Sequence, residues 1–253
     1  MGVGLAICQY AASEDLFQNV ETIRRAIESA NAEIYLFPEL FLTSYGCRSF
    51  DAEALSKAEE SIADISEEKG IAIAVGMPTI RSGKAYNSLV FFTPDSKSRY
   101  DKLYLANFAP YDEGIFEPGS RPTMVYWEGL KIGLEVCYDV MFPEIHRHYA
   151  KKGADLILVA SASAEKSRNA METVVPARSF ENTVYTAFCN NIGMGPAGKF
   201  YGGSAIFSPL GQKIDQLGDT EGIVLAYIDS EEITAARSAR HHLQDLRDDI
   251  DWS

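Results

Sequence analysis

Cys137 stands where a cysteine could act as a nucleophile. The segment 131–144 reads KIGLEVCYDVMFPE, and its apolar residues Ile132, Leu134 and Val136 alternate with other residues. This period of two predicts a strand that ends at Cys137. A side chain at the tip of a core strand is held rigidly and can face a pocket, as the serine of a nucleophile elbow does. Because free cysteines are among the most buried residues, a structural thiol is the alternative interpretation.

A cysteine thiol is a weak nucleophile at neutral pH unless a neighbour takes its proton or stabilises its thiolate. Histidine usually does this, but the four histidines lie in a charged helical segment and in the polar tail: His146, His148, His241 and His242. The His-x-His pair has no obvious third ligand, so we predict no metal site. Two other candidates lie at the ends of apolar strands, where Glu39 follows YLFP and Lys102 falls in SRYDKLYL.

The elements that would position these residues alternate between strands and helices in the first half of the chain. Helices are expected after Ser13, which would cap the first one, from Asp51 to Gly70, and over residues 144–152 and 168–182. The predicted strands are residues 3–10, 34–37, 71–75, 88–92, 98–103, 131–136, 156–160, 185–190, 204–208 and 222–229. The alternation indicates an α/β fold, and the central hairpin indicates mixed sheets. Many strands with about four helices fit two sheets packed face to face, with helices outside.

Composition restricts the class of protein and its partners. The chain has 253 residues, of which 46% are hydrophobic and 23% are charged, as in a globular protein with a sizeable core. Its net charge of −13 argues against nucleic acids and anionic membranes as partners, because both need a basic surface. No repeat, low-complexity tract or linker divides the sequence, so we predict one domain over residues 1–253. Its polar tail, residues 231–253, would lie along the outside or reach a partner subunit.

The cysteines and the N-terminal segment indicate a location. The four cysteines are far apart and none forms a CxxC pair, which disfavours zinc ribbons and thioredoxin-like motifs. The N-terminal MGVGLAICQY reads as a strand and lacks the features of a secretory signal. No apolar run approaches the ~18 residues of a membrane span. We therefore expect a cytoplasmic protein with reduced thiols.

In combination, the segments FPE (37–39), YDKLYL (100–105) and VCYDVMFPE (136–144) resemble the nitrilase superfamily of carbon–nitrogen hydrolases. Later stretches are similar to the family in the same order: PARSFENTVY (176–185), CNNIG (189–193), GGSAIFSPLGQ (202–212) and GIVLAYID (222–229). The resemblance covers nearly the whole chain. It implies a four-layer α–β–β–α sandwich of two mixed sheets. It also implies a homodimer or higher homo-oligomer, in which the C-terminal tail reaches across the interface.

The resemblance also implies roles for five residues. Cys137 would attack a carbonyl or nitrile carbon, and Glu39 would accept and return the proton. Lys102 and the backbone N–H of Tyr138 would stabilise the oxyanion, and Glu113 of DEGIFEPG would position the lysine or the substrate. This set supplies nucleophile, base and electrostatic stabilisation, so no cofactor is implied. The expected partner is a small-molecule amide.

Several alternatives stay open at the level of sequence. Cys-Tyr-Asp at the nucleophile is more similar to the amidase branches than to nitrilases proper, which carry Cys-Trp-Glu. The chain is therefore expected to be an amidase, with N-carbamoyl hydrolysis, nitrile hydrolysis or a non-catalytic scaffold as alternatives. Glu135 must be paired, exposed or protonated. Plausible pocket residues are Tyr45, Asn107, Phe108, Tyr111, Ser161 and Ser163.

Overall fold

The computed structural model describes residues 2–247 and 249–251 and contains two six-stranded sheets. In spatial order, the first sheet consists of β14 (Gly222–Ile228), β1 (Val3–Gln9), β2 (Ile34–Leu36), β3 (Ala72–Arg81), β4 (Lys84–Thr93) and β5 (Ser96–Asp101). The second consists of β13 (Lys213–Gln216), β12 (Ala205–Phe207), β9 (Tyr185–Asn190), β8 (Leu156–Ser161), β7 (Leu130–Val136) and β6 (Thr123–Trp127). A separate hairpin consists of β10 (Ile192–Gly195) and β11 (Gly198–Tyr201).

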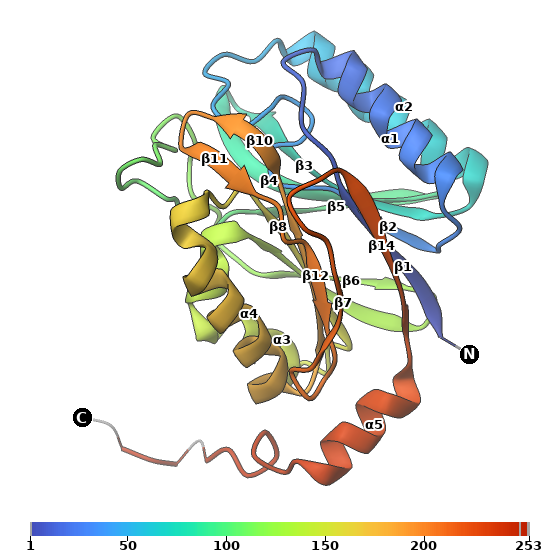
Figure 1. Ribbon diagram of the computed structural model, residues 1–253, viewed down its shortest axis with the longest axis vertical. Coiled ribbons are helices and arrows are strands. Elements are labelled where there is room, and N and C mark those ends of the chain that lie inside the picture. The colour runs from blue at the N-terminus through green and yellow to red at the C-terminus, as the bar shows by residue number, and fades with distance from the viewer. Residues whose placement is uncertain (1, 248, 252–253) are drawn as a thin grey trace.

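The helices lie outside the two sheets. They are α1 (Leu16–Ser29), α2 (Ala52–Lys69), α3 (Pro143–Lys151), α4 (Arg168–Asn182) and α5 (Ser230–Ala239). Figure 1 shows α1 and α2 on one side of the paired sheets and α3 and α4 on the other, with α5 beyond the end of the sheets. The predicted α–β–β–α sandwich of two mixed sheets is therefore confirmed.

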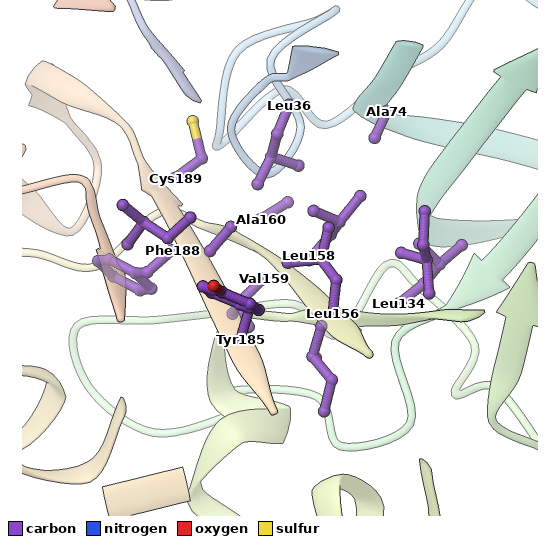
Figure 2. Close-up of a cluster of buried hydrophobic side chains, with 14 of the residues drawn as sticks. Leu36, Ala74, Leu134, Leu156, Leu158, Val159, Ala160, Tyr185, Phe188 and Cys189 are labelled. Carbon is purple, nitrogen blue, oxygen red and sulfur yellow. The ribbon is translucent and has the colours of Figure 1, made fainter. Parts of the chain in front are cut away.

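Alternation along the strands supplies two apolar layers. In β1, Leu5 and Ile7 belong to the core that contains both sheets, whereas Ala6 and Cys8 pack in the layer under α1 and α2. This is the pattern expected of a strand that is buried on both faces. In Figure 2, Leu36 and Ala74 of the first sheet and Leu134 and Leu158 of the second lie within the same buried cluster. The shared core fixes the two sheets relative to each other.

Strand direction brings candidate residues of the second sheet to one edge. β7 and β8 are parallel, and so are β8 and β9. The carboxyl ends of parallel strands meet at the same edge of a sheet, which is where ligands bind in many α/β folds. Cys137 follows β7, Ser161 ends β8 and Asn190 ends β9. These residues are therefore neighbours although they are far apart in sequence.

The capping residues predicted from the sequence are confirmed for α2 but not for α1. Asp51 caps α2, and Gly70 ends it with a left-handed backbone at φ 67°. The expectation that Ser13 caps α1 is wrong, because the Asp15 carboxylate accepts from the N–H groups of Phe17 and Gln18. The Ser13 hydroxyl instead accepts from the N–H of Asp15.

Other differences concern short or exposed elements. Strands β6, β10, β11 and β13 were not predicted, and the polar tail begins with α5, whose Ile233 is buried. Of the tail's remaining residues, 248, 252 and 253 lie outside the described part of the chain. None of the helices in the described ranges is long and apolar enough to cross a membrane. The role of residues 231–253 at a dimer interface stays a prediction.

Candidate active site

Glu39 lies in the tight loop that follows β2, and this loop crosses over β3. A Cβ at Gly76 of β3 would lie 2.2 Å from the Pro38 carbonyl oxygen and 2.6 Å from the Glu39 Cα. Only glycine allows the two backbones to approach this closely. Leu40, the next residue, has a left-handed backbone with φ 49°. Asn191 completes the support, because its Nδ2 donates to the Glu39 carbonyl at 2.8 Å.

Lys102 follows β5 and joins two glutamates. Its side chain is fully buried, and its Nζ donates to Glu39 Oε1 at 2.6 Å and to Glu113 Oε1 at 2.7 Å. Its backbone N–H donates to the Asn87 carbonyl at 2.8 Å, which continues the pairing of β4 and β5 by one residue. A buried ammonium is tolerated where charged and hydrogen-bonded partners surround it. The two carboxylates provide these partners.

The two glutamates differ in how their oxygens are used. Both oxygens of Glu113 are occupied, since Oε1 also accepts from the Tyr45 hydroxyl at 3.0 Å and Oε2 accepts from the Ala106 N–H at 2.9 Å. Glu39 Oε1 accepts from Lys102 and from Asn87 Nδ2, the latter at 2.8 Å. Glu39 Oε2 is buried and has no hydrogen-bond partner among the described residues. Glu39 therefore has one oxygen free to bind a proton.

Cys137 opens a 3₁₀ turn, Cys137–Met141, at the end of β7. Its φ of 47° is left-handed, a conformation that costs an L-residue energy and that clusters at functional sites. The Cys137 Sγ lies 3.5 Å from Ser163 Oγ, which in turn lies 2.9 Å from Ser161 Oγ. The N–H of Ser163 donates to Asn190 Oδ1 at 2.8 Å. Residues that follow β7, β8 and β9 thus meet around the thiol.

Asp139 ties this turn to the segment of Lys102. Its Oδ2 accepts from the Tyr100 hydroxyl at 2.7 Å, and its Oδ1 accepts from the Tyr104 N–H at 2.8 Å. Tyr100 belongs to β5 and Tyr104 follows Lys102. Burial raises the pKa of Asp139 to about 7, although Lys102 and these hydrogen bonds favour its ionised form. Asp139 therefore connects the two sheets through a buried carboxyl group.

A cavity of about 220 Å³ lies beside Cys137. Its walls come from the loop after β5, the cysteine turn and the segment leading into α4. The residues that line it are Ala106, Phe108, Tyr111, Glu113, Cys137, Tyr138, Met141, Ser163, Ser167, Ala170 and Met171. The nucleophile candidate and the lysine-bound Glu113 therefore face the same space.

The electrostatics keep the lysine charged and the thiol protonated. Burial lowers the pKa of Lys102, but Glu113 and Glu39 outweigh it, and the pKa lies well above its usual value. Burial raises the pKa of Glu39, with Lys102 opposing this effect and Glu113 adding to it. Burial and the charge of Glu39 raise the pKa of Cys137 to about 12, against the effect of Lys102. At neutral pH the resting site therefore holds a thiol, not a thiolate.

Comparison with known proteins decides the family. The family model of carbon-nitrogen hydrolases matches residues 4–238. The chain belongs to the carbon-nitrogen hydrolase family. The predicted membership in the nitrilase superfamily is thereby confirmed, and the chain is an amidase-like hydrolase of that family.

Relatives of this carbon-nitrogen hydrolase include amidases. An (R)-stereoselective amidase from Pseudomonas sp is 29% identical over 225 residues, which cover 87% of this chain and 81% of that protein. The 2-oxoglutaramate amidase of Bacillus subtilis is 28% identical over 230 residues, which cover 88% of each. Among solved structures, a glutamate variant of the amidase from Nesterenkonia sp. AN1 superposes with a TM-score of 0.85 at 28% identity, covering 97% of this chain and 94% of that one. It shows covalent addition of the acetamide moiety of fluoroacetamide at the active-site cysteine.

The structure of the hydrolase brings Glu39, Lys102 and Glu113 into direct contact and places Cys137 and Tyr138 on the adjoining cavity. The role of the Tyr138 N–H stays a prediction. Of the six residues expected in the pocket, Phe108, Tyr111 and Ser163 line it. The others support the site: Tyr45 binds Glu113, the Asn107 Oδ1 accepts from the Glu113 N–H, and Ser161 contacts Ser163. No group of three metal-ligating side chains forms within the described ranges.

Sequence reasoning missed several supporting residues of the hydrolase. Asn87 contacts Glu39, and Asn190 and Asn191 hold the loops of Ser163 and Glu39. The sequence did contain a signal for these three asparagines. Asparagine is depleted in strands, and all three lie within an apolar strand or directly after one. The sequence contains no comparable signal for Gly76, because only the fold shows that the backbone of residues 38–40 packs directly on it.

Glu135 of the hydrolase is fully buried beside a histidine, which excludes the alternative that it is exposed. His146 of α3 is buried, and its Nδ1 lies 2.6 Å from Glu135 Oε1. Glu135 and Gly133 share a face of β7, and a Cβ at Gly133 would meet the Tyr149 ring of α3 at 2.7 Å. The pair therefore lies between β7 and α3. His146, which the sequence places on a charged helix, is fully buried.

Proposed function

We propose that the protein hydrolyses the carbon–nitrogen bond of a small amide through a thioester at Cys137. One observation carries the proposal: a fully buried Glu39–Lys102–Glu113 cluster has a single unpaired carboxylate oxygen and adjoins the cavity that Cys137 lines. Nucleophile, base and ammonium are the groups that acyl transfer from an amide needs. The covalent adduct of the Nesterenkonia amidase at its active-site cysteine supports a thiol nucleophile here.

The first half-reaction forms the thioester. The Cys137 Sγ–H gives its proton to Glu39 Oε2 while Sγ bonds to the amide carbon, and the carbonyl oxygen becomes an oxyanion. Lys102 Nζ and the Tyr138 N–H stabilise that oxyanion. When the intermediate collapses, the C–N bond breaks and Glu39 returns the proton to the leaving nitrogen, so ammonia or an amine departs.

The second half-reaction regenerates the thiol. Glu39 takes a proton from water, and the resulting hydroxide attacks the thioester carbon. The C–S bond breaks, the proton on Glu39 returns to Cys137, and the acid leaves. Because the resting pKa of Cys137 is about 12, proton transfer must accompany the attack of sulfur. In this proposal Glu39 acts as a general base, and its Oε2, unpaired among the described residues, supports that role.

Ammonia release from a panel of amides, N-carbamoyl amino acids and nitriles tests the proposal, with Cys137→Ala as the control. We expect amides to be hydrolysed and the variant to be inactive while its melting temperature is preserved. Release from carbamoyl compounds or nitriles alone would keep the mechanism and change the named activity. A large loss of thermal stability in Cys137→Ala would favour a structural cysteine.

A non-catalytic scaffold is the alternative from another class, and alkylation distinguishes it. Iodoacetamide should modify Cys137 at neutral pH, and Glu39→Gln should slow the reaction because the amide cannot take the thiol proton. General bases contribute roughly 10²–10⁴-fold to rates, so we expect a loss of this order in kcat for the same variant. A Cys137 that is inert in the folded protein, together with no turnover of any compound, would support the scaffold.

A further inference from the structure

Among the described residues that line the cavity beside Cys137, none offers an unpaired charge to the acyl part of a substrate. Glu113 is the one charged residue among those that line it. Both Glu113 oxygens are engaged, by Lys102 and Tyr45 on one side and by the Ala106 N–H on the other. Lys102 itself is held between two carboxylates. The acyl part of a substrate therefore meets neither an available anion nor an available cation on this wall.

Two cationic residues neighbour the cavity in sequence and make hydrogen bonds to other groups of the protein. Lys166 and Arg168 flank Ser167, which lines the cavity. The Lys166 Nζ donates to the Ala109 carbonyl at 2.9 Å. The Arg168 guanidinium makes two hydrogen bonds to Glu165, at 2.7 Å and 2.9 Å. Neither side chain is among the described residues that line the cavity.

The polar groups of the wall are largely satisfied by one another. The Tyr111 hydroxyl accepts from the Ala164 N–H at 3.0 Å and lies 3.1 Å from Ser167 Oγ. Ser163 Oγ lies within reach of Ser161 and Cys137. What remains for the substrate is an apolar surface contributed by aromatic, methionine and alanine side chains: Phe108, Tyr138, Met141, Ala170 and Met171.

We infer that the acyl group of the substrate is neutral and apolar, so that the substrate class is simple aliphatic or small aromatic carboxamides. The inference rests on the proposed function. A charged end group would lose its hydration in the cavity without gaining a partner, which is costly. An anionic end group would also meet a site with two carboxylates to one ammonium, in a protein with net charge −13. Amides of dicarboxylic acids and of amino-alkyl acids are therefore expected to be poor substrates.

Shape-matched amides test the inference in the wild-type protein. 4-Methylpentanamide matches succinamate in shape, and pentanamide matches 4-aminobutanamide, so each pair differs mainly in charge. We expect kcat/KM for ammonia release to be at least about 100-fold higher for the neutral member of each pair. A charged member within tenfold of its neutral match would overturn the inference.

The Cys137→Ala control separates this inference from the proposed function. Cysteine-dependent hydrolysis of succinamate or 4-aminobutanamide at the neutral rate would overturn the inference and keep the proposed function. Hydrolysis that persists in Cys137→Ala would overturn the proposed function. If none of the four amides is hydrolysed, the inference falls, and the wider panel of amides, N-carbamoyl amino acids and nitriles decides the proposed function.

A charge placed at the cavity gives a second test. Ala170 is exposed, lines the cavity and lies in the first turn of α4, so a long side chain can be accommodated there. Ala170→Arg should raise the preference for succinamate over 4-methylpentanamide at least about tenfold, and Ala170→Gln, a neutral helix former, should not. Melting temperatures of both variants verify folding. An unchanged preference in folded Ala170→Arg would overturn the inference.

Discussion

At the scale of single residues, the proposed base Glu39 and the proposed nucleophile Cys137 both have pKa values above their ordinary ones. Burial favours the protonated form of both groups. The Cys137 thiol therefore needs a base to remove its proton, and the raised pKa makes Glu39 a better proton acceptor. A free Glu39 oxygen beside a protonated thiol is an arrangement for proton transfer during attack. The sequence could name both residues, but it could not give the sign of either pKa shift, because burial and Lys102 act in opposite directions.

The pH dependence of activity follows from Glu39. Its carboxylate must be unprotonated to accept the thiol proton, so kcat/KM should fall as pH falls through its pKa. Because burial raises that pKa, the acid limb should lie above the ordinary value of about 4.3. Lys102 stays protonated at neutral and moderately alkaline pH and should add no limb there. An acid limb at or below pH ~4, in protein that melting curves show to be folded, would contradict this assignment.

At the scale of elements, two buried contacts hold the turn of Cys137. Asp139 connects the turn to β5 and the segment after it, and Glu135 with His146 connects β7 to α3. Between them they fix the beginning and the end of the segment that carries the thiol. Each contact makes a prediction that stability measurements can check.

The Glu135–His146 contact should show strong coupling. His146→Leu removes the side chain that faces the buried Glu135 carboxyl group, and leaving a buried polar group without a partner typically costs about 1–3 kcal/mol. Replacing both residues by leucine should be nearly neutral, since two apolar side chains of similar volume often substitute for two buried polar ones. Urea unfolding of the two single variants and the double variant measures the coupling. Losses that simply add would show that the two side chains act independently.

Asp139 should make folding stability depend on pH. Its pKa is about 7 in the folded protein and about 3.9 in the unfolded chain, so the native state binds the proton more tightly. The resulting stabilisation is complete below pH ~4 and is lost as pH rises through 7, roughly 4 kcal/mol at most. Asp139→Asn cannot titrate and should flatten this dependence in urea unfolding at pH 5 and pH 8. If the free energy of unfolding changes equally between pH 5 and pH 8 in the wild type and in Asp139→Asn, Asp139 is not the source of the pH dependence.

At the scale of the whole molecule, the active site is divided between the sheets. Glu39 and Lys102 follow strands of the first sheet, and Cys137 follows a strand of the second. The strands β1, β7 and β8 could be predicted from their apolar residues, and the sandwich could be predicted because the segments around Glu39, Lys102 and Cys137 resemble a family. The support by Gly76, Asn87 and Asn191 could not, since it depends on contacts between segments that are distant in sequence. Short exposed strands such as β13 have too weak a pattern to predict.

The C-terminal tail should contribute to assembly, as predicted from the family resemblance. Beyond α5 the tail exposes Leu246 and Ile250, and α5 itself is anchored by the buried Ile233. We expect a dimer by size-exclusion chromatography with light scattering, and a shift toward monomer when residues 244–253 are deleted. The deletion spares α5, so the melting temperature at high protein concentration serves as the control for folding. An unchanged mass would place the interface elsewhere.

The pairing of β1 with β14 has a consequence for biosynthesis. Val3 pairs with Ile228 and Gln9 with Gly222, so the first strand of the described chain must wait for the last one to be synthesised. A growing chain already contains the glutamate, the lysine and the cysteine long before this edge of the first sheet can close. Such distant pairing slows folding and leaves an unpaired strand open to other chains in the meantime. Synthesis of residues 222–228 is thus a condition for completing the first sheet.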